Sequence, residues 1–311
     1  MADQTVSADK TLHLVGVGVK HSIAPPMHNF IAKSLGLPWT FYSTECPTLD
    51  DVMDLARTPS TAGLVVTMPY KNTIMSKLDR LDDLSTIVGA CNNVYRDPRD
   101  ETKLIGTNTD WLGIKGCLLE RGDETTRPKE GQTTVPALLV GAGGASRAAV
   151  YALSTHLHCP MIYLLNRDAA EVADLIRDVK KIQPTPTIIH IKSVEQASSL
   201  SSPYYIVGTV PDFPPRSDSE LAVAAVLEHF LSRSSPPGVL LDMCFKPRQT
   251  RIMKLAQKHG WPTVEGTHVI GYQIEQQWKL WTGQDVLGKM DGDGAWKLLL
   301  DAAETSPAIN F

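Results

Sequence analysis

Short apolar runs alternate with amphipathic stretches along the first half of the chain. Residues 12–19 (LHLVGVGV) are apolar, β-branched and punctuated by glycine, and 62–68 (AGLVVTM) has the composition of a buried strand. The predicted elements of this half are strands at 12–19, 38–42 and 62–68, helices at 27–35, 49–57 and 69–78, and a hairpin of 91–96 with 103–106. Strands and helices in alternation predict an α/β unit.

The second half has a more regular pattern. Strands are predicted at 137–140, 161–165, 187–191, 205–208 and 239–242, each separated by helical or loop sequence. Such a series predicts a parallel, doubly wound sheet. The segment 120–134, rich in charge, glycine and threonine, marks a boundary zone or an insertion between the halves. Residues 270–303 are helical by pattern, with interruptions expected near Gly283 and at 292–294.

Composition narrows the class of protein. A chain of 311 residues suggests about two domains. The net charge is −4 without a basic run, and no apolar stretch reaches about 18 residues, so neither a nucleic-acid partner nor a membrane span is expected. The five cysteines are widely spaced and form no C-x-x-C pair, which is typical of reduced thiols in a cytoplasmic protein without a metal site. The protein is expected to be a monomer or a homodimer.

A glycine-rich turn follows the strand at 137–140. Gly141 permits a tight turn, Gly143 lets the backbone approach a pyrophosphate, and the helix that follows offers free N–H groups at its N-terminus. Ser146 stands where the usual fingerprint has a third glycine. The pattern predicts dinucleotide binding, and a plain strand-to-helix turn is the alternative. The residues expected to bind the cofactor here are Gly141, Gly143, Gly144, Ala145 and Ser146.

The end of the next strand is expected to select the cofactor. An acidic residue there binds the ribose hydroxyls of NAD, whereas an arginine can hold the additional phosphate of NADP. Asn166, Arg167 and Asp168 offer both chemistries. A carboxylate beside a 2′-phosphate is repulsive, so NAD is favoured and NADP remains an alternative.

Polar clusters end three predicted strands of the first half. They are 21–25 (HSIAP), 66–71 (VTMPYK) and 106–110 (GTNTD), with 89–93 (GACNN) between the last two. Open α/β sheets bind ligands at the carboxyl ends of their strands. Taken singly, Lys71 could be a surface lysine, Asp110 a helix N-cap and Asn92 a turn residue. His28, shortly after the first cluster, is better explained by packing than by metal binding.

These clusters, in this order before GAGGASRA, closely resemble the shikimate/quinate dehydrogenase family, from about Leu12 to Trp281. GACNN and TMPYK are similar to the fungal-type quinate dehydrogenase branch. The resemblance implies a two-domain α/β fold, an N-terminal substrate domain with a Rossmann-like doubly wound domain. The implied ranges are 1–112 for the substrate-binding and catalytic domain, 113–268 for the NAD(P)-binding domain and 269–311 for C-terminal helices that return to the substrate domain.

The resemblance also implies a role for individual residues. Lys71 matches the catalytic lysine and Asp110 the catalytic aspartate. Oxidation of a secondary alcohol requires removal of the hydroxyl proton as the C–H bond breaks, and a positioned lysine can accept it. The implied substrate-binding residues are Ser22, Thr67, Asn92 and Gln273. The implied neighbours of the nicotinamide are Thr209, Val269 and Gly271.

Three positions depart from the family pattern. Ala24, Val65 and Phe245 stand where the family has serine, asparagine and tyrosine. Because each lost hydrogen bond can change affinity by about 1–3 kcal/mol, the substrate is expected to be affected. We expect an NAD(P)-dependent dehydrogenase that interconverts quinate, or shikimate, and its 3-dehydro ketone. The alternatives are a paralogue acting on another alicyclic polyol acid and a non-catalytic ligand-binding regulator.

Overall fold

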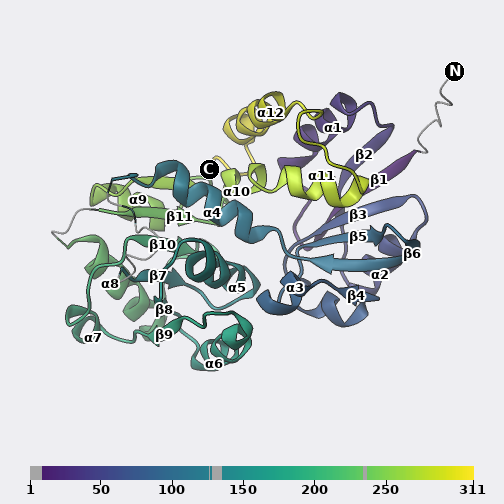
Figure 1. The fold of residues 1–311 in the computed structure, drawn as a ribbon. Coiled ribbons are helices and arrows are strands. Elements are labelled where there is room, and N and C mark those ends of the chain that lie inside the picture. The colour runs from purple at the N-terminus through teal and green to yellow at the C-terminus, as the bar shows by residue number, and fades with distance from the viewer. Residues whose placement is uncertain (1–8, 126, 128–134, 234–236) are drawn as a thin grey trace, which may run out of the picture. The chain divides into compact units, whose positions relative to one another are not determined.

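The computed structural model describes residues 9–125, 127, 135–233 and 237–311. The chain divides into two compact units, each built on one six-stranded sheet (Figure 1). Unit 1 comprises Met1–Thr86, Ala90–Thr109 and Gln273–Ser306, and unit 2 comprises Ile87–Gly89, Asp110–Tyr272 and Pro307–Phe311. The predicted two-domain α/β fold class is confirmed. Of the predicted boundary segment 120–134, residues 126 and 128–134 lie outside the described residues.

The sheet of unit 1 is mixed, with the order β2-β1-β3-β5-β6-β4. Its strands are β1 (Lys10–Gly16), β2 (Trp39–Glu45), β3 (Thr61–Val66), β4 (Arg80–Leu81), β5 (Asn93–Asp97) and β6 (Asp100–Thr107). β1 is parallel to both β2 and β3, whereas β5 is antiparallel to β3 and β6. The predicted hairpin is therefore confirmed as β5 and β6.

The helices of unit 1 come from both ends of the chain. They are α1 (Ala24–Ser34), α2 (Leu49–Arg57), the 3-10 helix η1 (Thr73–Lys77), α11 (Ile274–Thr282) and α12 (Gly292–Thr305), with α3 (Asp83–Val88) extending from unit 1 into unit 2. The indole N–H of Trp278 donates to Nδ1 of His28 at 3.1 Å, and the His28 ring stacks on Phe41. Burial lowers the pKa of His28 to about 3. His28 is thus a neutral packing residue that joins α1 to α11.

Unit 2 contains a fully parallel sheet with the order β12-β11-β10-β7-β8-β9. Its strands are β7 (Ala137–Val140), β8 (Met161–Leu165), β9 (Thr187–His190), β10 (Tyr205–Gly208), β11 (Val239–Asp242) and β12 (Thr263–Glu265). The strand order reverses between β7 and β10, and such a switch point is where doubly wound sheets bind their ligands. The five predicted strands are confirmed, and the short β12 was not predicted.

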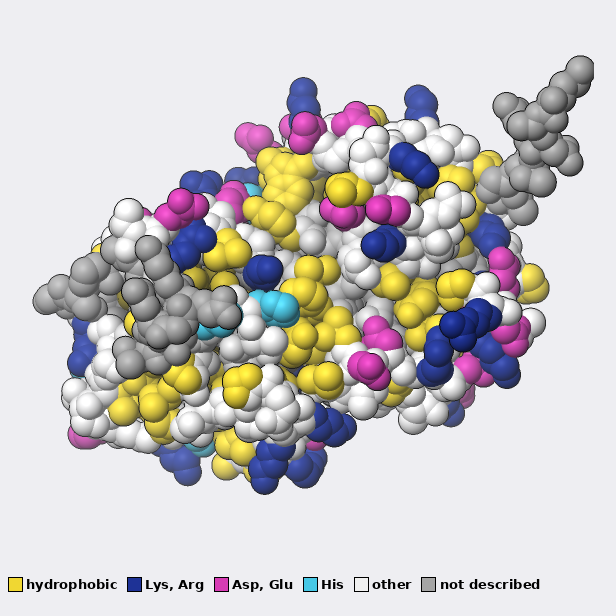
Figure 2. All heavy atoms as spheres, viewed as in Figure 1, with side chains coloured by type: hydrophobic (Ala, Val, Ile, Leu, Met, Phe, Trp, Pro, Cys, Tyr) yellow, Lys and Arg dark blue, Asp and Glu magenta, His cyan; other side chains and the backbone are white. Residues whose placement is uncertain are grey.

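Helices connect the strands of unit 2. They are α4 (Asp110–Arg121), α5 (Gly144–Tyr151), the π-helix η2 (Ala152–His156), α6 (Ala169–Asp178), the 3-10 helix η3 (Val179–Lys181), α7 (Val194–Ser198), α8 (Asp218–Leu231), α9 (Arg251–Lys258) and α10 (Gly266–Gly271). Within the described part of the chain, no helix is long and apolar enough to cross a membrane. On the face drawn in Figure 2, acidic and basic side chains are interspersed.

Two predicted elements were wrong in detail. The helix expected over 69–78 is only the 3-10 helix η1, because backbone bonds here join residues three apart, Tyr70 N–H to the Thr67 carbonyl at 3.0 Å and Met75 N–H to the Asn72 carbonyl at 3.4 Å. The interruption expected at 292–294 is instead the first turn of α12, capped by the carboxylate of Asp291. Gly294 permits close packing there, since a Cβ at this position would lie 2.7 Å from the Phe30 ring.

Candidate functional site

A buried polar cluster in unit 1 joins three segments that are far apart in the sequence. The Asn92 amide donates to Oε1 of Gln273 at 2.8 Å, and the Thr109 hydroxyl donates to the same oxygen at 2.7 Å. The Thr109 backbone N–H donates to Oδ1 of Asn92 at 2.6 Å. Two of the predicted substrate residues, Asn92 and Gln273, are thus brought into direct contact by the C-terminal segment.

Gln277 extends this cluster and was missed by the sequence analysis. It lies one helical turn after Gln273 on α11, and its amide donates to Oγ1 of Thr109 at 3.3 Å. Its Oε1 is buried without a hydrogen-bond partner among the described residues. A glutamine at i+4 on the same helix face was the signal that could have identified it.

The backbone of Lys71 is fixed beside the cluster. The Lys71 carbonyl accepts a hydrogen bond from the N–H of Cys91 at 2.7 Å, and the carbonyl of Asn92 accepts one from Val66 at 2.7 Å. The segment that carries Asn92 is therefore bonded to the end of β3 and to the lysine. Asp110 directly follows Thr109 in the chain, begins α4 and is buried.

Ser22 and Thr67 belong to neighbouring loops at the carboxyl edge of the unit 1 sheet. The Ser22 hydroxyl accepts from the N–H of Ala24 at 3.2 Å, at the start of α1. Thr67 donates its N–H to the carbonyl of Val15 at 3.0 Å. Gly16 makes this approach possible, because a Cβ there would lie 2.5 Å from Cγ2 of Thr67.

Glu45, at the end of β2, holds the loop that leads to Ser22. Its carboxylate accepts from the backbone N–H of Gly18 at 2.5 Å and of Val19 at 3.1 Å. The hydrogen bond from Gly18, with those from Val19 and Lys20, lowers the pKa of Glu45 below its ordinary value. No local motif indicates this contact, which depends on the parallel pairing of β1 with β2.

In unit 2, the glycine turn has the geometry that phosphate binding requires. Gly141 has φ +113°, a conformation that favours glycine, and a Cβ there would press against the Thr209 hydroxyl. Gly143 caps α5, no side chain caps that helix N-terminus, and a Cβ built on Gly143 meets nothing within 4 Å. Open space in front of an uncapped helix N-terminus fits a pyrophosphate.

Ser146 and Thr209, both predicted at the cofactor site, are in contact. Their hydroxyl oxygens are 2.7 Å apart, and the Thr209 hydroxyl donates to the carbonyl of Val140 at 2.8 Å. The Ser146 hydroxyl, at the third position of the fingerprint, is thus hydrogen-bonded to the residue that follows the end of β10. Val269 and Gly271 lie on α10, where Val269 packs so closely on α4 that a Cβ at Gly113 would contact it at 2.6 Å.

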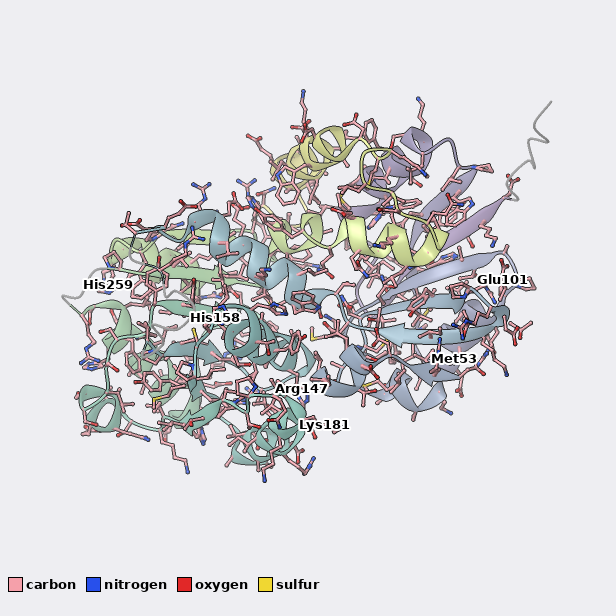
Figure 3. All side chains as sticks on the ribbon, in the orientation of Figure 1. Met53, Glu101, Arg147, His158, Lys181 and His259 are labelled. Atoms are coloured by element: carbon pink, nitrogen blue, oxygen red, sulfur yellow. The ribbon has the colours of Figure 1, made fainter. Side chains whose placement is uncertain are left out.

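Arg147, labelled in Figure 3, was missed by the sequence analysis. It is buried, and its guanidinium donates to the carbonyls of Ala142 and Gly143 at 3.0 and 3.1 Å and to the carboxylate of Asp178. The arginine therefore fixes the direction of two carbonyls of the glycine turn. A lone charge within the small-residue stretch GASRAAV was the available signal.

The polar side chains of the three residues after β8 are all engaged in hydrogen bonds or ion pairs. The Asn166 amide donates to the Glu171 carboxylate at 2.8 Å. Asp168 caps α6, accepting from the N–H groups of Ala170 and Glu171 through Oδ1. Arg167 forms an ion pair with Glu220. Among the described residues, no group of three or more His, Cys, Asp or Glu side chains could hold a metal ion.

Comparisons with known proteins agree on one family. Residues 14–94 match the model of the shikimate dehydrogenase substrate binding domain. A quinate dehydrogenase of Emericella nidulans is 33% identical over 299 residues, which are 90% of each chain. The pentafunctional AROM polypeptide of Eremothecium gossypii is 37% identical over 88% of this chain, which spans 17% of that polypeptide.

Solved structures show the same fold. A quinate dehydrogenase from Corynebacterium glutamicum, in complex with NAD, superposes with a TM-score of 0.73 at 21% identity. The match covers 94% of this chain and 100% of that one. A shikimate 5-dehydrogenase from Thermus thermophilus, in complex with NADP(H) and shikimate, gives 0.71 at 24% identity, covering 94% and 99%. At these identities the likeness establishes the fold alone.

Proposed function

This chain belongs to the shikimate/quinate dehydrogenase family, and we propose that it is an NAD(P)-dependent dehydrogenase that interconverts quinate, or shikimate, and its 3-dehydro ketone. The observation that carries the proposal is the buried cluster of Asn92, Thr109 and Gln273 beside Lys71. Buried polar side chains of this kind hold a small polyol by its hydroxyls. The family match over 14–94 lies almost wholly in unit 1, which supports a substrate role for that unit.

The proposed chemistry divides between a proton and a hydride. A bound nicotinamide supplies the hydride acceptor when the ring alcohol is oxidised. Nζ of Lys71 takes the hydroxyl proton as the C–H bond breaks and the C=O bond forms, and it returns the proton in the reverse direction. Asp110 serves as the carboxylate partner of this step. Asn92 and Gln273 fix the ring by its hydroxyls, with Ser22 and Thr67 placed for the carboxylate or neighbouring hydroxyls.

NAD is the proposed cofactor, and quinate the first substrate to test. The glycine turn from Gly141 to Ser146 holds the pyrophosphate, with Thr209, Val269 and Gly271 towards the nicotinamide. The Emericella nidulans relative aligns over most of both chains, which favours quinate. Ala24, Val65 and Phe245 are less polar than the family residues they replace, which is compatible with a changed ring substituent.

A steady-state assay tests the proposal directly. The purified protein is offered quinate or shikimate with NAD or NADP while the absorbance of reduced nicotinamide is followed. Turnover with quinate and NAD is the expected result. Absence of turnover in all four combinations, from protein shown to be folded, would contradict the proposed reaction and would favour another ring acid or a regulator.

Glu45→Gln is expected to weaken binding of the ring acid selectively. A neutral amide holds the N–H groups of Gly18 and Val19 less strongly, so the loop that carries Ser22 is less ordered before substrate binds. We expect KM for the ring acid to rise about threefold to tenfold, with KM for the cofactor unchanged. Because the folded-state pKa of Glu45 is lowered, the wild-type contact is retained above the ordinary glutamate range and is lost as pH falls through the lowered value.

Glu101→Gln is the matched control for this variant. Glu101, labelled in Figure 3, is an exposed glutamate on the hairpin of unit 1, where its carboxylate pairs with Lys10. The control is expected to keep both KM values. If Glu45→Gln leaves KM for the ring acid unchanged, the carboxylate does not order the substrate loop.

A further inference from the structure

NAD and NADP differ by a phosphate on the 2′-oxygen of the adenosine ribose. Arg167 is a cation at the position in the fold where that phosphate is expected. It follows β8, the strand that pairs with β7 and is therefore adjacent to the glycine turn. In doubly wound sheets, the end of this second strand lies beside the adenosine ribose, and an arginine there can hold a 2′-phosphate. The preference of this chain for NAD or NADP thus depends on which group pairs with the Arg167 guanidinium.

Glu220 forms an ion pair with that guanidinium. Oε1 of Glu220, in the first turn of α8, accepts a hydrogen bond from Nη1 of Arg167. The Arg167 side chain is 64% exposed and that of Glu220 only 26% exposed, so the carboxylate is the more firmly placed partner. The two residues are separated by 53 positions, so no local motif indicates the pair.

The carboxylate of Glu220 is held in place independently of Arg167. Its second oxygen accepts from the N–H groups of Arg216 and Ser217 at 2.8 and 2.9 Å, while the Ser217 hydroxyl accepts from the N–H of Glu220, which forms a capping box. The hydrogen bond from Ser217, followed by those from Arg216 and Arg167, lowers the pKa of Glu220 to about 2. The group is therefore an anion throughout the working pH range.

Asp168, the other carboxylate at the end of β8, caps a helix. Its Oδ1 accepts the first amides of α6, so this carboxylate is directed to its own helix. A phosphate brought to Arg167 must instead face the fixed negative charge of Glu220, and like charges placed together are strongly unfavourable. The diol of an NAD ribose, being neutral, meets no such repulsion.

We propose that Glu220 is a cofactor-specificity residue, which favours NAD over NADP by pairing with Arg167 and repelling a 2′-phosphate. This inference rests on the proposed dinucleotide function and goes beyond it, because it assigns the selection to a residue on α8. It also predicts that the capacity to bind NADP is latent in Arg167 and is released when the counter-charge is removed.

Calorimetric binding of two nucleotides tests the inference without turnover. Adenosine 2′,5′-bisphosphate carries the phosphate at issue, and adenosine 5′-monophosphate lacks it. For Glu220→Gln, which keeps a side-chain oxygen for the capping box, Kd for the bisphosphate is expected to fall about fivefold or more, with Kd for the monophosphate unchanged. Adding Arg167→Ala to this variant is expected to abolish the gain.

Glu228→Gln is the matched control, since Glu228 lies on the same helix and is paired with Lys258 instead. It is expected to change neither Kd. If Glu220→Gln binds both nucleotides as the wild type does, or tightens both equally, the inference is overturned while the dinucleotide site stands. If neither nucleotide binds to any of the folded proteins, the proposed cofactor site fails and the inference fails with it.

Discussion

Lys71→Met is expected to lower kcat for the ring acid by roughly a hundredfold to ten-thousandfold, the range over which a positioned acid–base group contributes. The thioether keeps a flexible side chain of similar length and cannot accept or return a proton. Binding should change much less, because Asn92, Thr109 and Gln273 are also hydrogen-bonded to one another. Rapid-mixing kinetics, with ligand affinity measured by calorimetry, separate the two effects.

Lys77→Met is the control for that experiment. Lys77 is an exposed lysine at the end of η1, a few residues further along the same segment, and its replacement should leave kcat unchanged. A Lys71→Met protein that retains wild-type turnover would remove the lysine from the mechanism. The family assignment would survive that result, because it rests on the alignment over 90% of the chain.

Gly143→Ala is expected to separate cofactor binding from stability. The methyl group meets no atom of the protein within 4 Å, and Gly143 has φ −79°, so the folded state tolerates alanine. A pyrophosphate that approaches the helix N-terminus would meet the added methyl group. We expect KM for the cofactor to rise about tenfold or more, with an unchanged melting temperature.

Gly141→Ala provides the contrasting case. Alanine at φ +113° is strained, and its Cβ would press against Thr209, so this variant is expected to lose stability as well as cofactor affinity. The two variants are compared by thermal unfolding and by cofactor titration. Equal cofactor affinity in Gly143→Ala and the wild type would contradict the placement of the pyrophosphate at this turn.

Four strands of unit 2, β7, β8, β10 and β11, could be predicted from sequence to the residue, and the predicted strand 187–191 ends one residue beyond β9. β7 and β10 lie within a parallel sheet and are buried at all four positions, so each is a continuous apolar run that ends at a turn. β12 has only three residues, Thr263–Glu265, and two of these are polar. Its assignment depends on pairing with β11, which no local pattern reveals.

The residues of the candidate site could be predicted where they lie in motifs, and not where they act through distant partners. Asn92 and Gln273 are 181 positions apart and meet only because α11 packs in unit 1. Glu45 was missed for the same reason, since it bonds the backbone N–H groups of Gly18 and Val19, 27 and 26 positions away. Arg147 differs, because the carbonyls that it bonds lie only four and five positions away within the same motif. Local motifs identify the chemistry, and long-range packing identifies the residues that position it.

Transfer of a labelled hydride tests whether this protein oxidises the ring alcohol with NAD. Quinate carrying deuterium on the carbon whose hydroxyl is oxidised is incubated with the protein and NAD, and both products are examined by mass spectrometry. Deuterium is expected in the reduced nicotinamide, with an unlabelled carbonyl carbon in the 3-dehydro product, and Lys71→Met is expected to form neither at a comparable rate. Quinate that binds to folded protein and keeps its deuterium, with NAD unreduced, would contradict the account.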